Sequence, residues 1–141
     1  MLIREAKQSD LKYIIELSKA LLHLDIPGFK WDKKEYISKS ISEHQYFVEE
    51  DSNQLGGFIQ LINKQKHVQL ETLAVSNQGK GIGRELVNFA IEYAKKLKIH
   101  QIKVSSYQAY LAVPFYQKMG FKRTRPGKAY GMRYFNLILR F

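Results

Sequence analysis

The chain has 141 residues, of which 45% are hydrophobic and 13% aromatic; this suffices for one compact domain with a sizeable core and argues against disorder. The sequence contains no cysteine, which excludes a disulfide scaffold, a thiolate metal site and a cysteine nucleophile. The apolar runs are short and the first residues carry no signal-peptide pattern, so we expect a cytoplasmic protein without a membrane partner.

The net charge of +10 is concentrated in the last third of the chain. Residues 1–92 contain 12 Lys/Arg and 13 Asp/Glu, whereas residues 93–141 contain 11 Lys/Arg and no acidic residue. Such an excess predicts an anionic partner, namely a polyphosphate cofactor, an acidic substrate or nucleic acid. A lysine-rich solvated surface is the simpler explanation for part of it.

Hydrophobic periodicity predicts the elements of the first half. A strand is expected over Leu2–Ala6, followed by a helix that Ser9 caps and whose apolar positions extend to Leu22. A second helix is expected over Lys33–Ser42. Three strands with short connections, which favour an antiparallel meander, are expected over Gln45–Glu50, Gly56–Ile62 and His67–Val75.

The second half alternates strand and helix. An amphipathic helix over Gly81–Lys98 precedes a strand over Gln101–Ser106, so this strand should run parallel to the strand that ends at Val75. A short helix over Ala109–Met119 and two closing strands, Phe121–Arg123 and Arg133–Arg140, complete the chain. The fold class is therefore α/β, with a mixed sheet and about four helices.

The segment between the third meander strand and the long helix is rich in glycine and reads Gln78-Gly79-Lys80-Gly81-Ile82-Gly83-Arg84. Its backbone N–H groups would lie at the positive end of a helix dipole, where a phosphate binds well. The Walker A pattern fails because Gly81 follows Lys80 where Ser or Thr is needed, and the dinucleotide fingerprint fails because Arg84 occupies the third glycine position. A Gln-x-x-Gly-x-Gly turn remains, which by itself is equally a tight strand-to-helix connection.

A second segment, Ala112-Val113-Pro114-Phe115-Tyr116-Gln117-Lys118-Met119-Gly120-Phe121, completes the pattern. Together with Leu73-Ala74-Val75 and the glycine turn, it resembles the GNAT family of acyl-CoA-dependent N-acetyltransferases. The opening Ile3-Arg4-Glu5-Ala6 is similar to the first strand of that family. The resemblance covers essentially the whole chain. It implies one GNAT domain over residues 1–141, whose sheet has antiparallel N-terminal strands and a splayed parallel pair.

The resemblance implies acetyl-CoA as co-substrate and no metal. The backbone of Leu73, Ala74 and Val75 would bind the pantetheine arm. The pyrophosphate would be held by the turn residues, which are Gln78, Gly79, Lys80, Gly81, Ile82, Gly83 and Arg84. Only Ser76-Asn77 separates Val75 from Gln78, whereas many relatives have two more residues there, so the pyrophosphate contacts stay open.

The same resemblance implies two catalytic residues and direct acetyl transfer to a primary amine. Tyr116 matches the general acid of the family, which protonates the departing thiolate. The alternative is that Tyr116 only packs as an aromatic residue. Glu71 lies on the strand of Leu73 and is expected on the same face. It would deprotonate the amine directly or be replaced by a water relay; otherwise it is a paired structural glutamate.

The acceptor stays unnamed at this level. In this family, acceptor specificity resides in the first two helices and in the loop before the last strand, here about His23–Trp31 and Arg125–Met132. In these segments Phe29, Trp31 and Tyr130 would line a cleft or serve as core anchors. The basic stretch Lys122–Arg133 predicts an acceptor with acidic groups. A non-catalytic CoA- or nucleic-acid-binding module is the alternative, although no interleaved aromatic and basic RNA-binding motif is present. A homodimer is left open, and the four histidines are interpreted as non-ligands.

Overall fold

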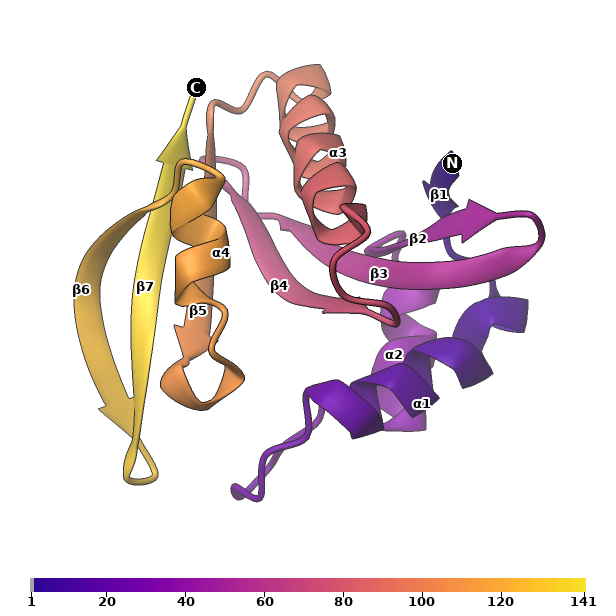
Figure 1. The fold of residues 1–141 in the computed structure, drawn as a ribbon, viewed down its shortest axis with the longest axis horizontal. Helices are drawn as coiled ribbons and strands as arrows, with labels where there is room; N and C mark the ends of the chain where they lie inside the picture. Colours follow the sequence, from indigo (N-terminus) through magenta and orange to yellow (C-terminus); the bar gives the residue numbers. More distant parts are fainter. Residues whose placement is uncertain (1) are drawn as a thin grey trace. The chain divides into compact units, whose positions relative to one another are not determined.

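The computed structural model describes residues 2–141, which form four α-helices and one seven-stranded mixed sheet in the order β1-β2-β3-β4-β5-β7-β6 (Figure 1). The chain divides into two compact units. The first extends to Leu61 and resumes over Thr72–Leu86, and the second comprises Ile62–Glu71 and Val87–Phe141. The α/β class with a mixed sheet and four helices is thereby confirmed.

The N-terminal unit contains an antiparallel meander of β1 (Leu2–Glu5), β2 (Tyr46–Asp51) and β3 (Gln54–Asn63). Ser52 and Asn53 join β2 to β3 and both have positive φ angles, of 51° and 64°. Positive φ angles at both residues are typical of the two-residue turns whose twist matches that of an antiparallel strand pair. Of the meander expected over Gln45–Glu50, Gly56–Ile62 and His67–Val75, the antiparallel pairing of the first two strands is confirmed, and the third strand is the next neighbour in the sheet.

Two helices, α1 (Leu11–Leu21) and α2 (Lys34–Ser42), lie side by side in this unit (Figure 1). Their apolar faces pack against the strands in a single core. Its buried residues are Ala6, Ile14, Leu22, Ile37, Ile41, Tyr46, Val48, Phe58 and Ala74. Burying a large aliphatic or aromatic side chain contributes about 1.5–3 kcal/mol. Burial in this core therefore stabilises the two helices, whose apolar residues recur at helical spacing in the sequence.

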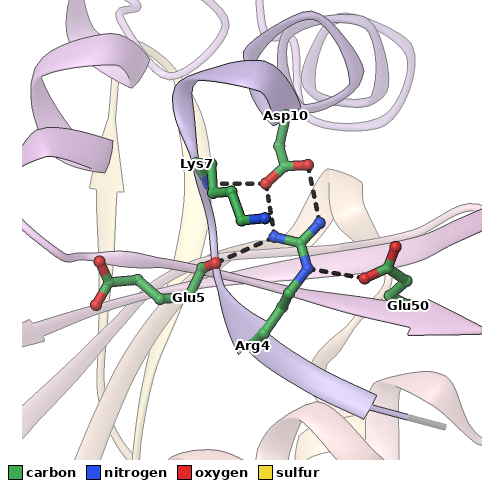
Figure 2. Close-up of polar contacts among 5 residues, drawn as sticks. All are labelled: Arg4, Glu5, Lys7, Asp10 and Glu50. Atoms are coloured by element: carbon green, nitrogen blue, oxygen red, sulfur yellow. Dashed lines mark hydrogen bonds and ion pairs between the residues drawn. The ribbon is translucent and has the colours of Figure 1, made fainter. Parts of the chain in front are cut away.

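A polar network ties β1 to the start of α1 (Figure 2). The Arg4 guanidinium donates to both carboxylate oxygens of Asp10, at 2.9 and 3.1 Å, and to Glu50 Oε1 at 2.8 Å. The Lys7 backbone N–H donates to Asp10 Oδ2 at 2.7 Å. Burial raises the pKa of Asp10, but the bonds from Arg4 and Lys7 outweigh it, so the pKa lies below its usual value.

The C-terminal unit is built on a parallel pair and a hairpin. The start of β4 (Val68–Val75) pairs with β5 (Gln101–Tyr107) in parallel, with Leu70 opposite Val104. Strand β5 pairs antiparallel with β7 (Met132–Arg140), which pairs antiparallel with the edge strand β6 (Lys122–Ala129). The helices α3 (Ile82–Lys96) and α4 (Val113–Lys118) complete the chain. The predicted parallel pairing is confirmed.

The N-cap expected for the first helix is wrong. Ser9 lies inside a 3₁₀ turn over Gln8–Asp10, and Asp10 occupies the N-cap of α1. The reason is the polar network of Arg4, because the Asp10 carboxylate already binds the Lys7 N–H and the guanidinium. The helix therefore begins at Leu11.

The C-terminal boundaries also differ from expectation. The short helix begins at Val113 rather than Ala109, because Leu111 adopts a left-handed φ of 56° and Pro114 favours a helix start beside it. The segment expected as a loop over Arg125–Met132 is mostly strand. Its connection is a two-residue turn, Tyr130-Gly131, whose φ angles of 53° and 76° suit a hairpin.

We predict that Asp10→Asn lowers the free energy of unfolding by about 1–2 kcal/mol near neutral pH, because the Arg4 guanidinium loses its ionised partner. The stabilisation by a carboxylate of lowered pKa is present above its unfolded pKa and is lost as pH falls through the folded value. The deficit of the variant should therefore shrink in acid. Urea unfolding at neutral and acidic pH measures both effects.

The matched control is Glu16→Gln, since Glu16 forms only an exposed pair with Lys12 at 4.0 Å, with its side chain 65% exposed. Its expected cost is below about 0.5 kcal/mol. Equal losses in the two variants would contradict a structural role for the Asp10 carboxylate.

Candidate functional site

The connection from β4 to α3 is a turn with two left-handed glycines. Strand β4 ends at Val75 and α3 begins at Ile82. Between them Gly79 and Gly81 have φ angles of 82° and 79°. The Glu85 N–H then donates to the Gly81 carbonyl at 3.0 Å as the first helical bond. Glycine is the residue that adopts this backbone with little strain.

The space over this turn is open. A Cβ added to Gly79 or Gly81 would meet no atom within 4 Å, and residues 76–81 are all exposed. The glycines are therefore required by their φ angles rather than by crowding. The first N–H groups of an α-helix have no intrahelical acceptor and lie at the positive end of its dipole. The turn thus presents donors and positive potential to solvent, which suits a phosphate.

The turn is anchored from behind by β3 and α1. The Ser76 N–H donates to the Gly56 carbonyl at 2.8 Å, and the Ser76 hydroxyl lies 2.6 Å from the Tyr13 hydroxyl. A Cβ on Gly57 would lie 2.8 Å from the Ala74 carbonyl oxygen, so β3 approaches β4 closely at this point. These contacts fix the end of β4 with only Ser76-Asn77 before Gln78.

A buried carboxylate, Glu49, also lies near the start of α3. Its side chain is 2% exposed, and burial is the main reason why its pKa is raised, with Asp51 adding repulsion. A Cβ on Gly56 would lie 2.8 Å from both Glu49 Oε1 and Ile82 Cδ1. Sequence reasoning missed Glu49 and the contact of Tyr13 with Ser76, because both depend on packing between distant elements.

Tyr116 lies on α4 and is 5% exposed. Its ring makes edge-to-face contacts with Phe115 and Phe121, at centroid distances of 5.3 and 5.4 Å. Burial raises the pKa of its phenol, so the hydroxyl keeps its proton over the whole working range. Gly120 ends this helix with a φ of 101°, as expected for a glycine after the C-cap.

Glu71 follows the last parallel pair of β4, Leu70 opposite Val104, and is half-buried. Val68 and Leu70 are buried whereas Gln69 and Glu71 are half-buried, so the alternation expected from the sequence is present here. His67, just before the strand, has a lowered pKa because of burial and the nearby Lys103 and Lys64 cations. Its imidazole is therefore neutral at pH values where histidine is partly charged in water.

The predicted site residues fall into two sets. Glu71 and Tyr116 belong to the C-terminal unit. The predicted cofactor residues, from Leu73 to Val75 and from Gln78 to Arg84, belong to the N-terminal unit and form one continuous segment from strand to helix. The side chains of Lys80 and Arg84 are exposed beside the turn.

Of the aromatic residues expected near the acceptor, Phe29 and Trp31 are in contact, with ring centroids 5.3 Å apart. Phe29 also contacts His23, whose Nδ1 lies 2.7 Å from the buried Asp32 carboxylate. Phe29 is 9% exposed, which fits a core anchor. Tyr130 is 64% exposed in the β6–β7 turn.

Residues 2–141 contain neither of two other kinds of site. No group of three or more His, Cys, Asp or Glu side chains in this part of the chain is arranged to hold a metal ion. Within the same range, no helix has the length and hydropathy needed to cross a bilayer.

Solved structures share this fold over nearly the whole chain. PaiA N-acetyltransferase from Thermoplasma acidophilum, solved with coenzyme A, has a TM-score of 0.81 at 21% identity and covers 99% of this chain and 98% of its own. The yncA protein from Salmonella typhimurium, solved with acetyl-CoA, has a TM-score of 0.80 at 21% identity, with coverages of 99% and 93%.

Ribosomal-protein-alanine N-acetyltransferase from Brucella melitensis has a TM-score of 0.77 at 18% identity, and each chain is covered completely. A search of curated proteins found no match. The family model of the acetyltransferase (GNAT) domain matches residues 29–139. That range contains both motifs and most of the sheet, and the chain therefore belongs to the GNAT acetyltransferase family.

Proposed function

We propose that the protein is an N-acetyltransferase that moves an acetyl group from acetyl-CoA directly to a primary amine. The observation that carries the proposal is the open turn with Gly79 and Gly81 in left-handed conformation at the start of α3, in a chain of the GNAT family. Two structural neighbours were solved with acetyl-CoA or coenzyme A, which supports the same co-substrate here.

The residues present fit such a ligand. The backbone of Leu73, Ala74 and Val75 would bind the pantetheine amides. The backbone N–H groups of the turn from Gly79 through Ile82 and Gly83 would bind the pyrophosphate, with Gln78 at its opening and Lys80 and Arg84 adding positive charge. Nothing lies over the two left-handed glycines, so phosphate oxygens could approach the amides closely.

The chemistry assigned to Tyr116 is proton donation to sulfur. The amine nitrogen attacks the thioester carbonyl carbon, the C–S bond breaks, and the sulfur receives a proton as the thiol leaves. A buried phenol with a raised pKa is fully protonated and can donate. The same low polarity raises the pKa of a departing thiolate, which favours accepting that proton.

Glu71 is assigned to the amine. An alkylammonium has a pKa of about 10.4 in water and must lose a proton before it attacks. Glu71 is a half-buried carboxylate on β4 in the same unit as Tyr116, and it would accept that proton directly or through water. No covalent enzyme intermediate is required, so catalysis would rest on positioning and proton transfer.

The acceptor is proposed to be a small molecule or peptide amine that carries acidic groups, because the C-terminal strands are strongly basic. The direct test is a screen for free thiol released from acetyl-CoA with amino acids, polyamines, aminoglycosides and acidic peptides. Turnover with acidic acceptors is expected. Preference for a polycation such as spermine would contradict the proposal of an acidic acceptor. The absence of thiol release with every amine would contradict the proposed acetyltransferase activity.

We predict that Tyr116→Phe lowers kcat by about 100-fold or more, because the ring still packs but the proton donor is gone. The Kd for acetyl-CoA should change less than about twofold, since the phenol is not assigned to binding. Stopped-flow thiol release and calorimetric titration measure the two quantities. Tyr93→Phe, which removes the hydroxyl of a half-buried tyrosine on α3, is the control and should leave kcat unchanged.

An unchanged kcat in Tyr116→Phe would remove the residue from the mechanism. The alternative of a non-catalytic CoA- or nucleic-acid-binding module is tested by the Tyr116→Phe, Glu71→Gln double variant. If the protein is an enzyme, the double variant loses acetyl transfer and still binds acetyl-CoA. If it is a binding module, neither the wild type nor the double variant transfers acetyl groups.

We predict that Gly79→Ala or Gly81→Ala weakens acetyl-CoA binding about tenfold, because the added methyl enters the open space over the turn and strains a left-handed backbone. Gly131→Ala is the matched control, since Gly131 has a φ of 76° and equally open surroundings in the β6–β7 turn. It should cost similar folding stability and leave the Kd for acetyl-CoA unchanged. Equal Kd values in all three variants would contradict a phosphate role for the turn.

A further inference from the structure

Two arginines pack against one buried ring on the β6–β7 hairpin, and a lysine lies directly across from one of them. The guanidinium carbons of Arg123 and Arg133 lie 4.2 and 5.5 Å from the centroid of Phe135. Lys128 is the cross-strand partner of Arg133, so both side chains leave the same face. All three cationic side chains are exposed, whereas Phe135 is 9% exposed. We call this set the basic face.

A β-bulge creates the basic face. Arg123 and Lys128 are five positions apart and would leave opposite faces of a regular strand. The register of β6 shifts between Arg123 and Pro126, however, and this shift turns Arg123 toward the side of Lys128. The bulged residues are held by Asn136, whose side-chain amide donates to the Arg125 carbonyl at 2.8 Å. The Thr124 hydroxyl donates to the Asn136 carbonyl at 3.2 Å.

This arrangement is unfavourable for the folded chain by itself. Like charges directly opposite on neighbouring strands repel, as Lys128 and Arg133 do. Residues 93–141 contain no acid, and among the described residues none of the three cations of the basic face has a carboxylate within 4 Å. The bulge adds a third cation to this pair, so one face of the hairpin carries three positive charges with no acidic side chain to offset them.

We propose that the basic face binds an acidic polypeptide segment. Guanidinium groups that pack on a ring are held in position for bidentate contacts with carboxylates. A single-stranded nucleic acid would need an aromatic face on which bases stack. Phe135 is buried and has two guanidiniums packed against it, so it offers none. The lack of a backbone N–H at Pro126 and the bulge also disfavour simple strand addition at β6.

This docking surface goes beyond acetyl transfer and stands without it, because binding can be measured with no acetyl-CoA present. If the proposed transfer also holds, a segment bound here would bring its own amine to the enzyme. The two proposals therefore fail separately, one in a binding assay and the other in a turnover assay.

The test is fluorescence anisotropy of a labelled peptide of alternating Glu and Gly with the full chain at low ionic strength. Arg123→Gln, Arg133→Gln should raise the Kd about tenfold or more, and salt should weaken binding to the wild type. The control Lys19→Gln, Lys96→Gln removes two exposed cations from α1 and α3. It has the same net charge and should change the Kd less than about twofold.

A charge-retaining variant, Arg123→Lys, Arg133→Lys, guards against a folding defect and should bind with an intermediate Kd. Thermal unfolding of each variant accompanies the titrations. Equal weakening in the Lys19, Lys96 control would overturn the proposal, since net charge alone would then explain binding. So would tighter binding of a single-stranded oligonucleotide of equal charge through the same arginines, or the absence of peptide binding to the wild type.

Discussion

The left-handed backbone of Gly79 and Gly81 is the constraint on which the proposed site depends. It turns the chain from β4 into α3 within six residues and leaves the first helical amides facing open space. Any other residue at these φ angles strains the turn and places a side chain where a phosphate would lie. The close approach of Gly57 to β4 and the bonds of Ser76 hold this geometry from behind.

The positive charge of the chain has a different location from the glycine turn. Within the turn only Lys80 and Arg84 are cationic, and backbone amides supply most of the donors. Strands β6 and β7 carry six Lys/Arg and no acidic residue, and the bulge after Arg123 places two of these cations against Phe135. The proposed cofactor site would therefore account for little of the net charge of +10, and the acidic partner proposed for the hairpin would account for more of it.

Structural features that depend on residues close together in the sequence were predicted correctly. The helical spacing that begins at Leu11, the strand-helix-strand order around the turn, and the glycine after α4 all follow from short stretches of sequence, and each is present. The prediction of Ser9 as the cap was wrong because the neighbouring Asp10 carboxylate binds the Lys7 N–H and the Arg4 guanidinium, an arrangement that hydrophobic spacing does not indicate. The hairpin was predicted too short because a bulge accommodates Pro126 within β6 and a turn of only two residues, Tyr130-Gly131, joins β6 to β7.

The candidate site divides in the same way. The turn and the Phe115-Tyr116 segment are readable because their residue types are required at fixed spacing. Other contacts join elements that are far apart in the sequence, and no residue spacing predicts them. These are Glu49 beside Ile82 and Tyr13 beside Ser76. The basic face could not be predicted from the sequence either. Arg123 and Lys128 lie on the same side of β6 only because of a bulge, which is visible in the strand register.

The proposed pyrophosphate site in the turn between β4 and α3 is tested by calorimetric titration of acetyl-pantetheine and of S-acetyl-4′-phosphopantetheine. These two ligands differ only in the first phosphate of the pyrophosphate, whereas acetyl-CoA also carries adenosine and a 3′-phosphate. Acetyl-pantetheine should bind about tenfold or more weakly to the wild-type protein than its 4′-phosphate does. Equal affinity for the two ligands would show that the turn does not bind this phosphate.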